Sequence, residues 1–307
     1  MRVLVTGGAG FIGSHIVDTF VAAGHDVGVV DNFWEHGGGR RANLNPKATF
    51  SQLDIRDSAL ADVFLSFKPE IVCHHAAQHS VAISTKDPQY DADVNVKGLI
   101  HVAQAAGRAG ARKIIYASSA ATYGAPQHIP IDEDHPQRPE SPYGITKMAG
   151  EHYLRYFAGA DGPSFTALRY GNVYGPRQDP AGEAGVIAIF ASRILAGEPI
   201  RVDWDGEQQK DYVYVGDVAR ANLLALSAAN GEVVNIGTGV GTSVNQLHRL
   251  IADAAGRDVA VEHAPKRAGD VGLSIFAIGR AKSLLGWEPQ VALRDGIAQT
   301  VDYFKSL

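Results

Sequence analysis

Short apolar runs alternate with longer amphipathic segments through the first half of the chain. The runs are rich in β-branched residues and cover residues 3–6, 26–31, 48–54, 70–75, 113–118 and 165–170. Between them, apolar residues recur at helical spacing in residues 12–23, 59–67, 93–108 and 143–158. This alternation predicts an α/β fold, a doubly wound parallel Rossmann sheet with crossover helices.

The pattern loosens after Gly171, where glycine and proline cluster before shorter strand and helix candidates. A strand at 211–214, a helix at 217–228 and a strand at 233–236 look like elements of the first sheet again. We therefore expect a smaller, interleaved C-terminal lobe. The larger domain would comprise residues 1–171 with returning segments at about 211–240, and the lobe the remainder of 172–307.

Composition and charge exclude several classes of protein. The 307 residues are 45% hydrophobic and 20% charged, which is typical of a globular enzyme. The net charge of −5 comes from 33 acidic and 28 basic residues that are scattered, so no basic stripe favours nucleic acid or a membrane surface. Cys73, the one cysteine, lies in an apolar run and is interpreted as a small buried residue. Because no signal peptide or spanning apolar run is evident, we expect a cytoplasmic protein.

A glycine-rich turn follows the first predicted strand directly. Gly7, Gly10 and Gly13 are spaced three apart between this strand and the helix that begins near Phe11 and Ile12. The first glycine permits a tight turn, the second lets the backbone approach a pyrophosphate, and the third lets the helix pack on the strand. The helix N-terminus would then face the phosphates. The turn predicts a dinucleotide site, the alternative being a structural turn without a ligand.

The second strand ends at Asp31 and Asn32, which favours NAD over NADP. A carboxylate there accepts hydrogen bonds from the adenosine ribose hydroxyls, whereas NADP needs a cation for its 2′-phosphate. Arg40 and Arg41 follow in a glycine-rich loop and are interpreted either as such cations or as a solvated face. Asp54 and Ile55, after the third strand, are expected beside the adenine. A helix cap at Asp57 explains that segment equally well.

Tyr143 and Lys147 stand four residues apart, so both project from one face of a helix that starts after Pro142. A free tyrosine has a pKa near 10, too high for a base at neutral pH. A nearby ammonium together with a positive nicotinamide would lower that pKa. This spacing occurs by chance in many helices, and it indicates catalysis here because a dinucleotide turn precedes it.

The glycine spacing and these motifs together resemble the extended short-chain dehydrogenase/reductases, and within them the bacterial UDP-glucose 4-epimerases. Further matching segments are residues 75–78, 80–81, 93–96 with Gly98, 169–178, 211–215, 217–219 and 235–237. The resemblance covers nearly the whole chain. It implies Ser119, Tyr143 and Lys147 as the catalytic residues, and it adds Ala76, Ala77 and Asn95 to the NAD site.

The resemblance also implies a nucleotide-sugar site in the second lobe. Asn172 and Arg267 match residues that hold the diphosphate, and Lys210 stands where the family usually has arginine. The lysine ammonium is a single point charge, whereas the arginine guanidinium can form two parallel hydrogen bonds, so the replacement loosens diphosphate binding. Each of these cations could instead be ordinary surface charge. Ser274 aligns with a position that is bulky in some epimerases, so its small side chain is expected to leave room for a 2-acetamido group.

The implied activity is NAD-dependent 4-epimerisation of a UDP-hexose, glucose or galactose or their N-acetyl forms, through a 4-keto intermediate and without a metal. Ala120 and Ala121 replace the acids that dehydratases carry after the serine, so elimination has no evident catalyst. Glucuronate epimerases differ at Asn172 and at Asp179, whose charge would repel a uronate. Three rival functions stay open: an epimerase for a UDP-glucuronate or dTDP-sugar substrate, a dehydrogenase or reductase that exchanges its cofactor, and a binding protein without catalysis.

The family further implies a homodimer formed through the helices at 93–108 and 143–158. No exposed apolar patch in the sequence shows this independently. The expected partners are thus a UDP-sugar and a second copy of the chain, with no nucleic acid and no membrane.

Overall fold

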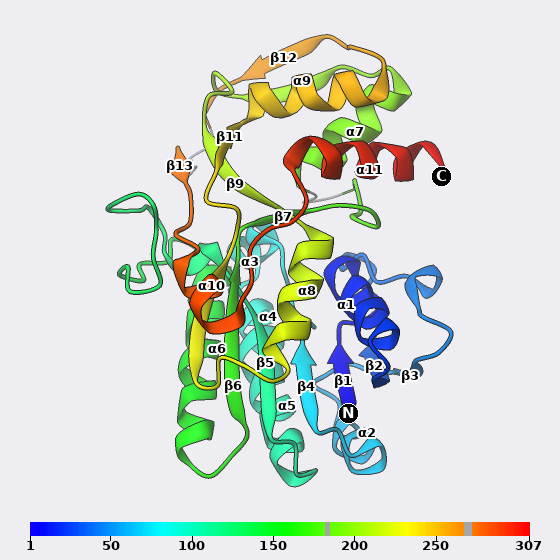
Figure 1. Ribbon diagram of the computed structural model, residues 1–307, viewed down its shortest axis with the longest axis vertical. Helices are drawn as coiled ribbons and strands as arrows, with labels where there is room; N and C mark the ends of the chain where they lie inside the picture. The colour runs from blue at the N-terminus through cyan, green and yellow to red at the C-terminus, as the bar shows by residue number, and fades with distance from the viewer. Residues whose placement is uncertain (182–184, 267–271) are drawn as a thin grey trace.

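A seven-stranded parallel sheet forms the larger part of the molecule (Figure 1). The structure, a computed structural model, describes residues 1–181, 185–266 and 272–307. The strand order is β10-β6-β5-β4-β1-β2-β3. The strands are β1 (Arg2–Thr6), β2 (Asp26–Asp31), β3 (Thr49–Gln52), β4 (Ile71–His74), β5 (Lys113–Ser119), β6 (Ser164–Tyr170) and β10 (Glu232–Ile236). The predicted doubly wound sheet is confirmed, with a third strand shorter than expected.

Helices cover both faces of this sheet, because side chains along each strand point alternately to the two sides. Val3 and Val5 of β1 pack in one core with α1 (Phe11–Ala22), α8 (Val215–Ala225) and α10 (Gly279–Leu285). Leu4, between them, packs in the opposite core with α2 (Leu60–Phe67), α5 (Gly98–Arg108) and α6 (Pro142–Gly159). Both faces of the sheet are therefore buried, which explains why its strands read as continuous apolar runs.

The single helix expected over 93–108 is divided in the structure. Two short helices, α3 (Val81–Lys86) and α4 (Pro88–Ala92), precede a π-helical segment η2 (Asp93–Lys97), which leads into α5. The Asn95 side chain donates to the backbone oxygen of Gln78 and accepts from its nitrogen, each at 2.9 Å. These bonds hold the wider turn against the loop after β4, and π turns of this kind are frequent near functional sites.

A smaller lobe lies beyond the carboxyl ends of the large sheet (Figure 1). Its main sheet contains β7 (Asn172–Tyr174), β9 (Gln209–Tyr214), β11 (Gly241–Ser243) and β13 (Leu273–Ser274), and β8 (Ile200–Asp203) pairs with β12 (Val261–Ala264). Helices α7 (Val186–Ala196), α9 (Val244–Ala255) and α11 (Leu293–Lys305) supply much of its core. None of the helices in the described part of the chain has both the length and the apolar character to cross a bilayer.

One expectation about this lobe was wrong. The strand predicted at 211–214 forms as β9, but it pairs with β7, β11 and β13 and not with the large sheet. Its apolar pattern marks a buried strand without specifying a neighbour, so the sequence could not assign it to a sheet. The helix and strand that follow do return to the large sheet, as α8 and β10.

Candidate cofactor and catalytic site

A cavity of about 540 Å³ opens at the carboxyl ends of β1 and β4, where the strand order changes direction. Open α/β sheets bind ligands at this point because the loops from the two strands diverge there. Every residue that the sequence predicted for the cofactor borders the cavity except Asn95, which lies behind Gln78. The sequence did not predict the contribution of the loop around Trp34 or of Gln178 and Asp179.

The glycine turn is enforced by close backbone contacts. Gly7 has a φ of 72°, and a Cβ there would lie 2.6 Å from the nitrogen of Ala76. A Cβ on Gly13 would collide with the carbonyl oxygen of Gly7. Gly10 is the N-cap of α1 and carries no side chain that could block the helix terminus. The free N–H groups of the first turn of α1 therefore border the cavity, where a pyrophosphate is favoured.

We predict that Gly13→Ala reduces bound dinucleotide at least about tenfold, because the added methyl separates α1 from the turn. The measurement is the nucleotide released from purified, heat-denatured protein. Gly159→Ala is the matched control, since no atom lies within 4 Å of a Cβ at that helical position. It should retain full nucleotide content, and equal content in both variants would contradict the role of Gly13.

Asp31 is placed to meet an adenosine ribose. Its carboxylate is 9% exposed and accepts from the backbone nitrogens of Ala9 at 3.0 Å and Phe33 at 2.9 Å. Burial raises the pKa of Asp31, and the two backbone donors oppose that rise. Asn32 donates to Asp54 at 3.0 Å, so the ends of β2 and β3 are joined at the same edge of the cavity.

The two arginines considered for NADP have protein partners. Arg40 pairs with Asp179 at 2.7 Å, and Arg41 donates to Gln52 at 2.7 Å and lies 5.0 Å over the Phe33 ring. A 2′-phosphate would have to compete with these contacts, so the geometry favours NAD. The helix cap considered at Asp57 does not form, because the N-cap of α2 is Ala59, and Asp57 accepts from the backbone nitrogen of Ala59 in the turn before the helix.

The three predicted catalytic residues lie together. Helix α6 begins after Ser141, whose hydroxyl accepts from the nitrogen of Gly144, and this places Tyr143 in the first turn. The Tyr143 phenol forms a hydrogen bond with the Ser119 hydroxyl at the end of β5. Lys147 donates to the carbonyl of Ala117 at 2.9 Å, and its Nζ lies 5.7 Å from the centre of the Tyr143 ring. One face of α6 thus carries the phenol and the ammonium into the cavity.

The groups of the chain alone raise the pKa of Tyr143. Burial raises the pKa of Tyr143 to about 12, the Ser119 hydrogen bond lowers it, and the charge of Asp91 raises it. Burial also lowers the pKa of Lys147 to about 8, which Asp91 opposes. The motif led us to expect that Lys147 and a positive nicotinamide together lower the phenol pKa. Without the nicotinamide, the groups of the chain do not lower this pKa, because the desolvation of the buried phenol is the larger effect.

A buried ion pair between Glu151 and Arg169 supports the end of β5, and we did not predict it from the sequence. Ser118 donates to Glu151, which binds Arg169 through both carboxylate oxygens at 2.9 and 2.6 Å. The Glu151 and Arg169 side chains are only 2% and 4% exposed. Arg169 also donates to the Tyr123 hydroxyl at 2.8 Å. The available signal was Glu151 four residues after Lys147, on the same face of α6.

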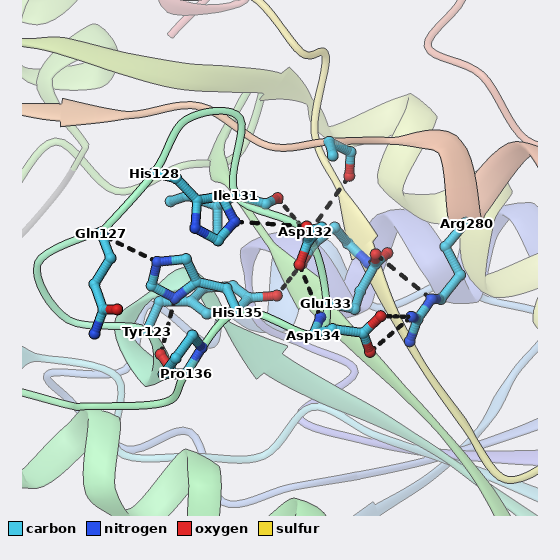
Figure 2. Close-up of polar contacts among 12 residues, drawn as sticks. Tyr123, Gln127, His128, Ile131, Asp132, Glu133, Asp134, His135, Pro136 and Arg280 are labelled. Atoms are coloured by element: carbon cyan, nitrogen blue, oxygen red, sulfur yellow. Dashed lines mark hydrogen bonds and ion pairs between the residues drawn. The ribbon is translucent and has the colours of Figure 1, made fainter.

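The loop that follows Tyr123 is held by the polar contacts drawn in Figure 2. Arg280 of α10 donates to both carboxylate oxygens of Asp134 at 2.9 Å and lies 3.6 Å from Glu133. His135 accepts from the nitrogen of Gln127 at 2.9 Å and packs edge-on against the Tyr123 ring. Glu133 and Asp134 are thus directed toward α10, and neither borders the cavity.

The smaller lobe brings three of the four predicted sugar-nucleotide residues together. Strand β9 pairs with both β7 and β13, and the register sets Lys210 opposite Ser274 and Tyr212 opposite Asn172. The Asn172 side chain donates to the carbonyl of Asp211 at 3.1 Å, so it fixes the neighbouring backbone. Arg267 lies outside the described residues.

Comparison with known proteins agrees with this geometry. Residues 3–237 match the model of the family described as "NAD dependent epimerase/dehydratase family". A UDP-glucose 4-epimerase of Mycolicibacterium smegmatis is 45% identical over 313 residues, covering 100% of this chain and 99% of the relative. A crystal structure of UDP-glucose 4-epimerase with UDP-glucose from Thermotoga maritima superimposes with a TM-score of 0.96 at 47% identity, covering 100% of this chain and 99% of that one.

A UDP-glucose 4-epimerase of Thermus thermophilus in complex with NAD superimposes with a TM-score of 0.94 at 43% identity, over 99% of each chain. These similarities extend over both lobes, and the Thermus thermophilus structure is a complex with NAD. The resemblance inferred from the motifs is therefore confirmed, and the chain belongs to the NAD-dependent epimerase/dehydratase family.

Proposed function

We propose that this protein is a UDP-glucose 4-epimerase that inverts C4 of a UDP-hexose by using NAD. The observation that carries the proposal is the hydrogen bond between Ser119 and Tyr143, since the Tyr143 side of this pair borders the same cavity as Lys147 and the glycine turn. The likeness to UDP-glucose 4-epimerases over the full length of the chain supports the same reaction.

Tyr143 is proposed to remove the proton of the sugar 4-hydroxyl. Ser119 bridges that hydroxyl and the phenol, since its Oγ lies at the strand end and already accepts from the nitrogen of Ala121 at 3.1 Å. NAD, when bound, would supply the redox chemistry as the acceptor and donor of the C4 hydride. When hydride returns, Tyr143 gives its proton back to the 4-oxygen. No net oxidation results.

Lys147 is proposed to hold the nicotinamide ribose and to stabilise the phenolate. Its Nζ has one fixed partner, the carbonyl of Ala117, and an ammonium offers two further N–H donors. The cavity also fits NAD, because Gly10 at the N-terminus of α1 carries no side chain that would block a pyrophosphate, and Asp31 presents carboxylate oxygens to a ribose. Both ends of a dinucleotide have matching donors and acceptors.

The sugar nucleotide is proposed to be anchored by the smaller lobe through Asn172, Lys210 and Arg267. The anchor must hold the diphosphate while the 4-keto sugar turns to present its other face. Ser274 stands opposite Lys210, and its small side chain is proposed to leave space beside that sugar, so that UDP-N-acetylhexosamines are also accepted. Failure of every UDP-N-acetylhexosamine while UDP-galactose reacts would contradict that acceptance.

The charge argument against a uronate is weaker than the sequence indicated. Asp179 borders the cavity, but its carboxylate is paired with Arg40 at 2.7 Å, so much of its negative charge is balanced. A neutral hexose remains our proposal. A panel of UDP- and dTDP-sugars that includes UDP-glucuronate tests both the sugar and the base.

Homodimerisation through α5 and α6 is part of the proposal. Ile145, Tyr153 and Tyr156 of α6 are 50%, 39% and 68% exposed, which is unusual for large apolar side chains on one helix. Their burial against a second copy would account for this exposure. Sedimentation of the protein, with Tyr156→Glu as the disrupting variant, tests the dimer.

We predict that the purified protein epimerises UDP-galactose without added NAD, because the same cofactor is oxidised and reduced in each cycle. Denaturation should release stoichiometric NAD, and added NAD should leave the rate unchanged for fully loaded protein. Accumulation of reduced cofactor in solution in step with sugar oxidation would instead indicate a dehydrogenase.

A further inference from the structure

Asp91 of α4 is a fully buried carboxylate that the reaction described so far does not use. It is 0% exposed. Its Oδ1 accepts from Gln78 Nε2 at 2.7 Å and Asn95 Nδ2 at 3.0 Å, and its Oδ2 accepts from the Thr146 hydroxyl at 2.7 Å. All three donors are neutral. Because burying a carboxylate costs free energy unless the charge is compensated, this arrangement calls for a cation nearby.

The three donors come from three elements that meet at the cavity. Gln78 follows β4 and borders the cavity. Asn95 lies in η2, and its side chain binds the backbone of Gln78 and reaches the Thr146 hydroxyl at 3.2 Å. Thr146 lies on α6 between Tyr143 and Lys147. One carboxylate thus connects the cavity wall to the helical turn that carries the catalytic pair.

Lys147 directly follows Thr146, the residue that binds Asp91, so we take Lys147 as the cation of this turn. Asp91 raises the pKa of both Lys147 and Tyr143, so its field reaches both groups. Burial lowers the pKa of His74 and His75 to about 3, so neither is charged at neutral pH. Glu151 is occupied by Arg169. Other titratable groups also face the turn between Tyr143 and Lys147. They are His74 at the end of β4, His75 directly after it, Tyr116 of β5 and Glu151 of α6.

We propose that Asp91 is a positioning residue for the epimerase reaction: through Thr146 and Asn95 it holds the Tyr143–Lys147 turn against the cofactor wall, and its carboxylate is the buried counter-charge of Lys147. The inference rests on the proposed function. The Asp91 charge is needed because Lys147 and a positive nicotinamide would repel each other in a cavity of low dielectric. A fixed anion behind α6 reduces that repulsion without contacting the substrate.

The test is Asp91→Asn, which keeps the size of the side chain and removes its charge. Loss of a negative charge makes proton release easier from both Tyr143 and Lys147, so both pKa values should fall. The profile of kcat/KM against pH should therefore move to lower pH, by on the order of one pH unit. A loss of activity that is uniform across pH, without such a shift, would overturn the proposal that Asp91 is the counter-charge of Lys147.

Two variants separate charge from geometry. Thr146→Val breaks the link to α6 and keeps the Asp91 charge, so kcat should fall roughly tenfold without a shift in the pH profile. Asp93→Asn is the matched control, because Asp93 is 44% exposed and pairs with the exposed Lys97. It should behave like the wild type. Unchanged kcat in Thr146→Val overturns the positioning role, and this holds even where Asp91→Asn does not fold.

A second measurement does not depend on turnover. The ammonium of Lys147 can be titrated by NMR of [13C]lysine-labelled, NAD-loaded protein, with Lys147→Arg identifying the signal. Its midpoint should lie lower in Asp91→Asn than in the wild type, and equal midpoints overturn the proposal. Absence of epimerase activity in the wild type would refute the proposed function alone, since the titration still reports on Asp91.

Discussion

Replacing Tyr143 by phenylalanine is expected to lower the rate of UDP-galactose epimerisation by about 10²- to 10⁴-fold, the usual contribution of a general base. The substitution removes one oxygen, the partner of the Ser119 hydroxyl, and leaves the ring packed beside Lys147. Bound NAD and thermal stability should remain close to those of the wild type. The measurement is the initial rate at saturating substrate together with nucleotide content.

Tyr153→Phe is the control for this variant. Tyr153 lies on the same helix, is 39% exposed and does not border the cavity, so its hydroxyl should not affect the rate. A Tyr143→Phe protein that retains more than about a tenth of the wild-type rate with full NAD content would show that another group accepts the proton.

The largest effect on stability is expected from Arg169→Ala. The Arg169 and Glu151 side chains are almost fully buried, so removal of the guanidinium leaves Glu151 charged and unpaired. Breaking a buried pair in this way costs about 3–5 kcal/mol of the free energy of unfolding. Chemical denaturation monitored by circular dichroism measures it. Tyr123 also loses the Arg169 donor, and Glu151, the partner of the Ser118 hydroxyl, loses its ion pair, so activity should fall with stability.

Two further variants define the cause. Arg201→Ala removes a pair with Asp203 in which the Arg201 side chain is 61% exposed, so it should cost at most about 0.5 kcal/mol. Glu151→Gln combined with Arg169→Ala leaves no unpaired charge and should recover part of the loss. If the double variant is as unstable as Arg169→Ala alone, the loss arises from packing and the explanation by charge is wrong.

The parts of the fold that the sequence predicted well are those where one local constraint decides the structure. Gly7 and Gly13 allow only the observed turn, since any side chain there meets backbone atoms. Of the six strands predicted in the first half, β1, β2, β4, β5 and β6 are mostly buried on both faces and therefore mostly apolar, whereas β3 at the edge of the sheet is partly exposed. Lys147 and Tyr143 share a helical face by spacing alone.

The remaining features depend on contacts between segments that are distant in sequence. The assignment of β9 to the smaller sheet follows from its pairing with β7 and β13, which no local pattern encodes. The π turn at Asn95 depends on the backbone of Gln78. The high pKa of Tyr143 arises from desolvation, which the sequence does not reveal. Asp91 was missed for the same reason, because its three partners meet only in the folded chain.

The most direct test of the central claim follows the hydride itself. UDP-galactose deuterated at C4 is incubated with the purified protein without added NAD, and the UDP-glucose formed is analysed by NMR. Hydride that leaves C4 and returns to the same carbon predicts full retention of deuterium at C4. Deuterium lost to solvent or appearing on cofactor in solution, or no UDP-glucose at all, would contradict the account.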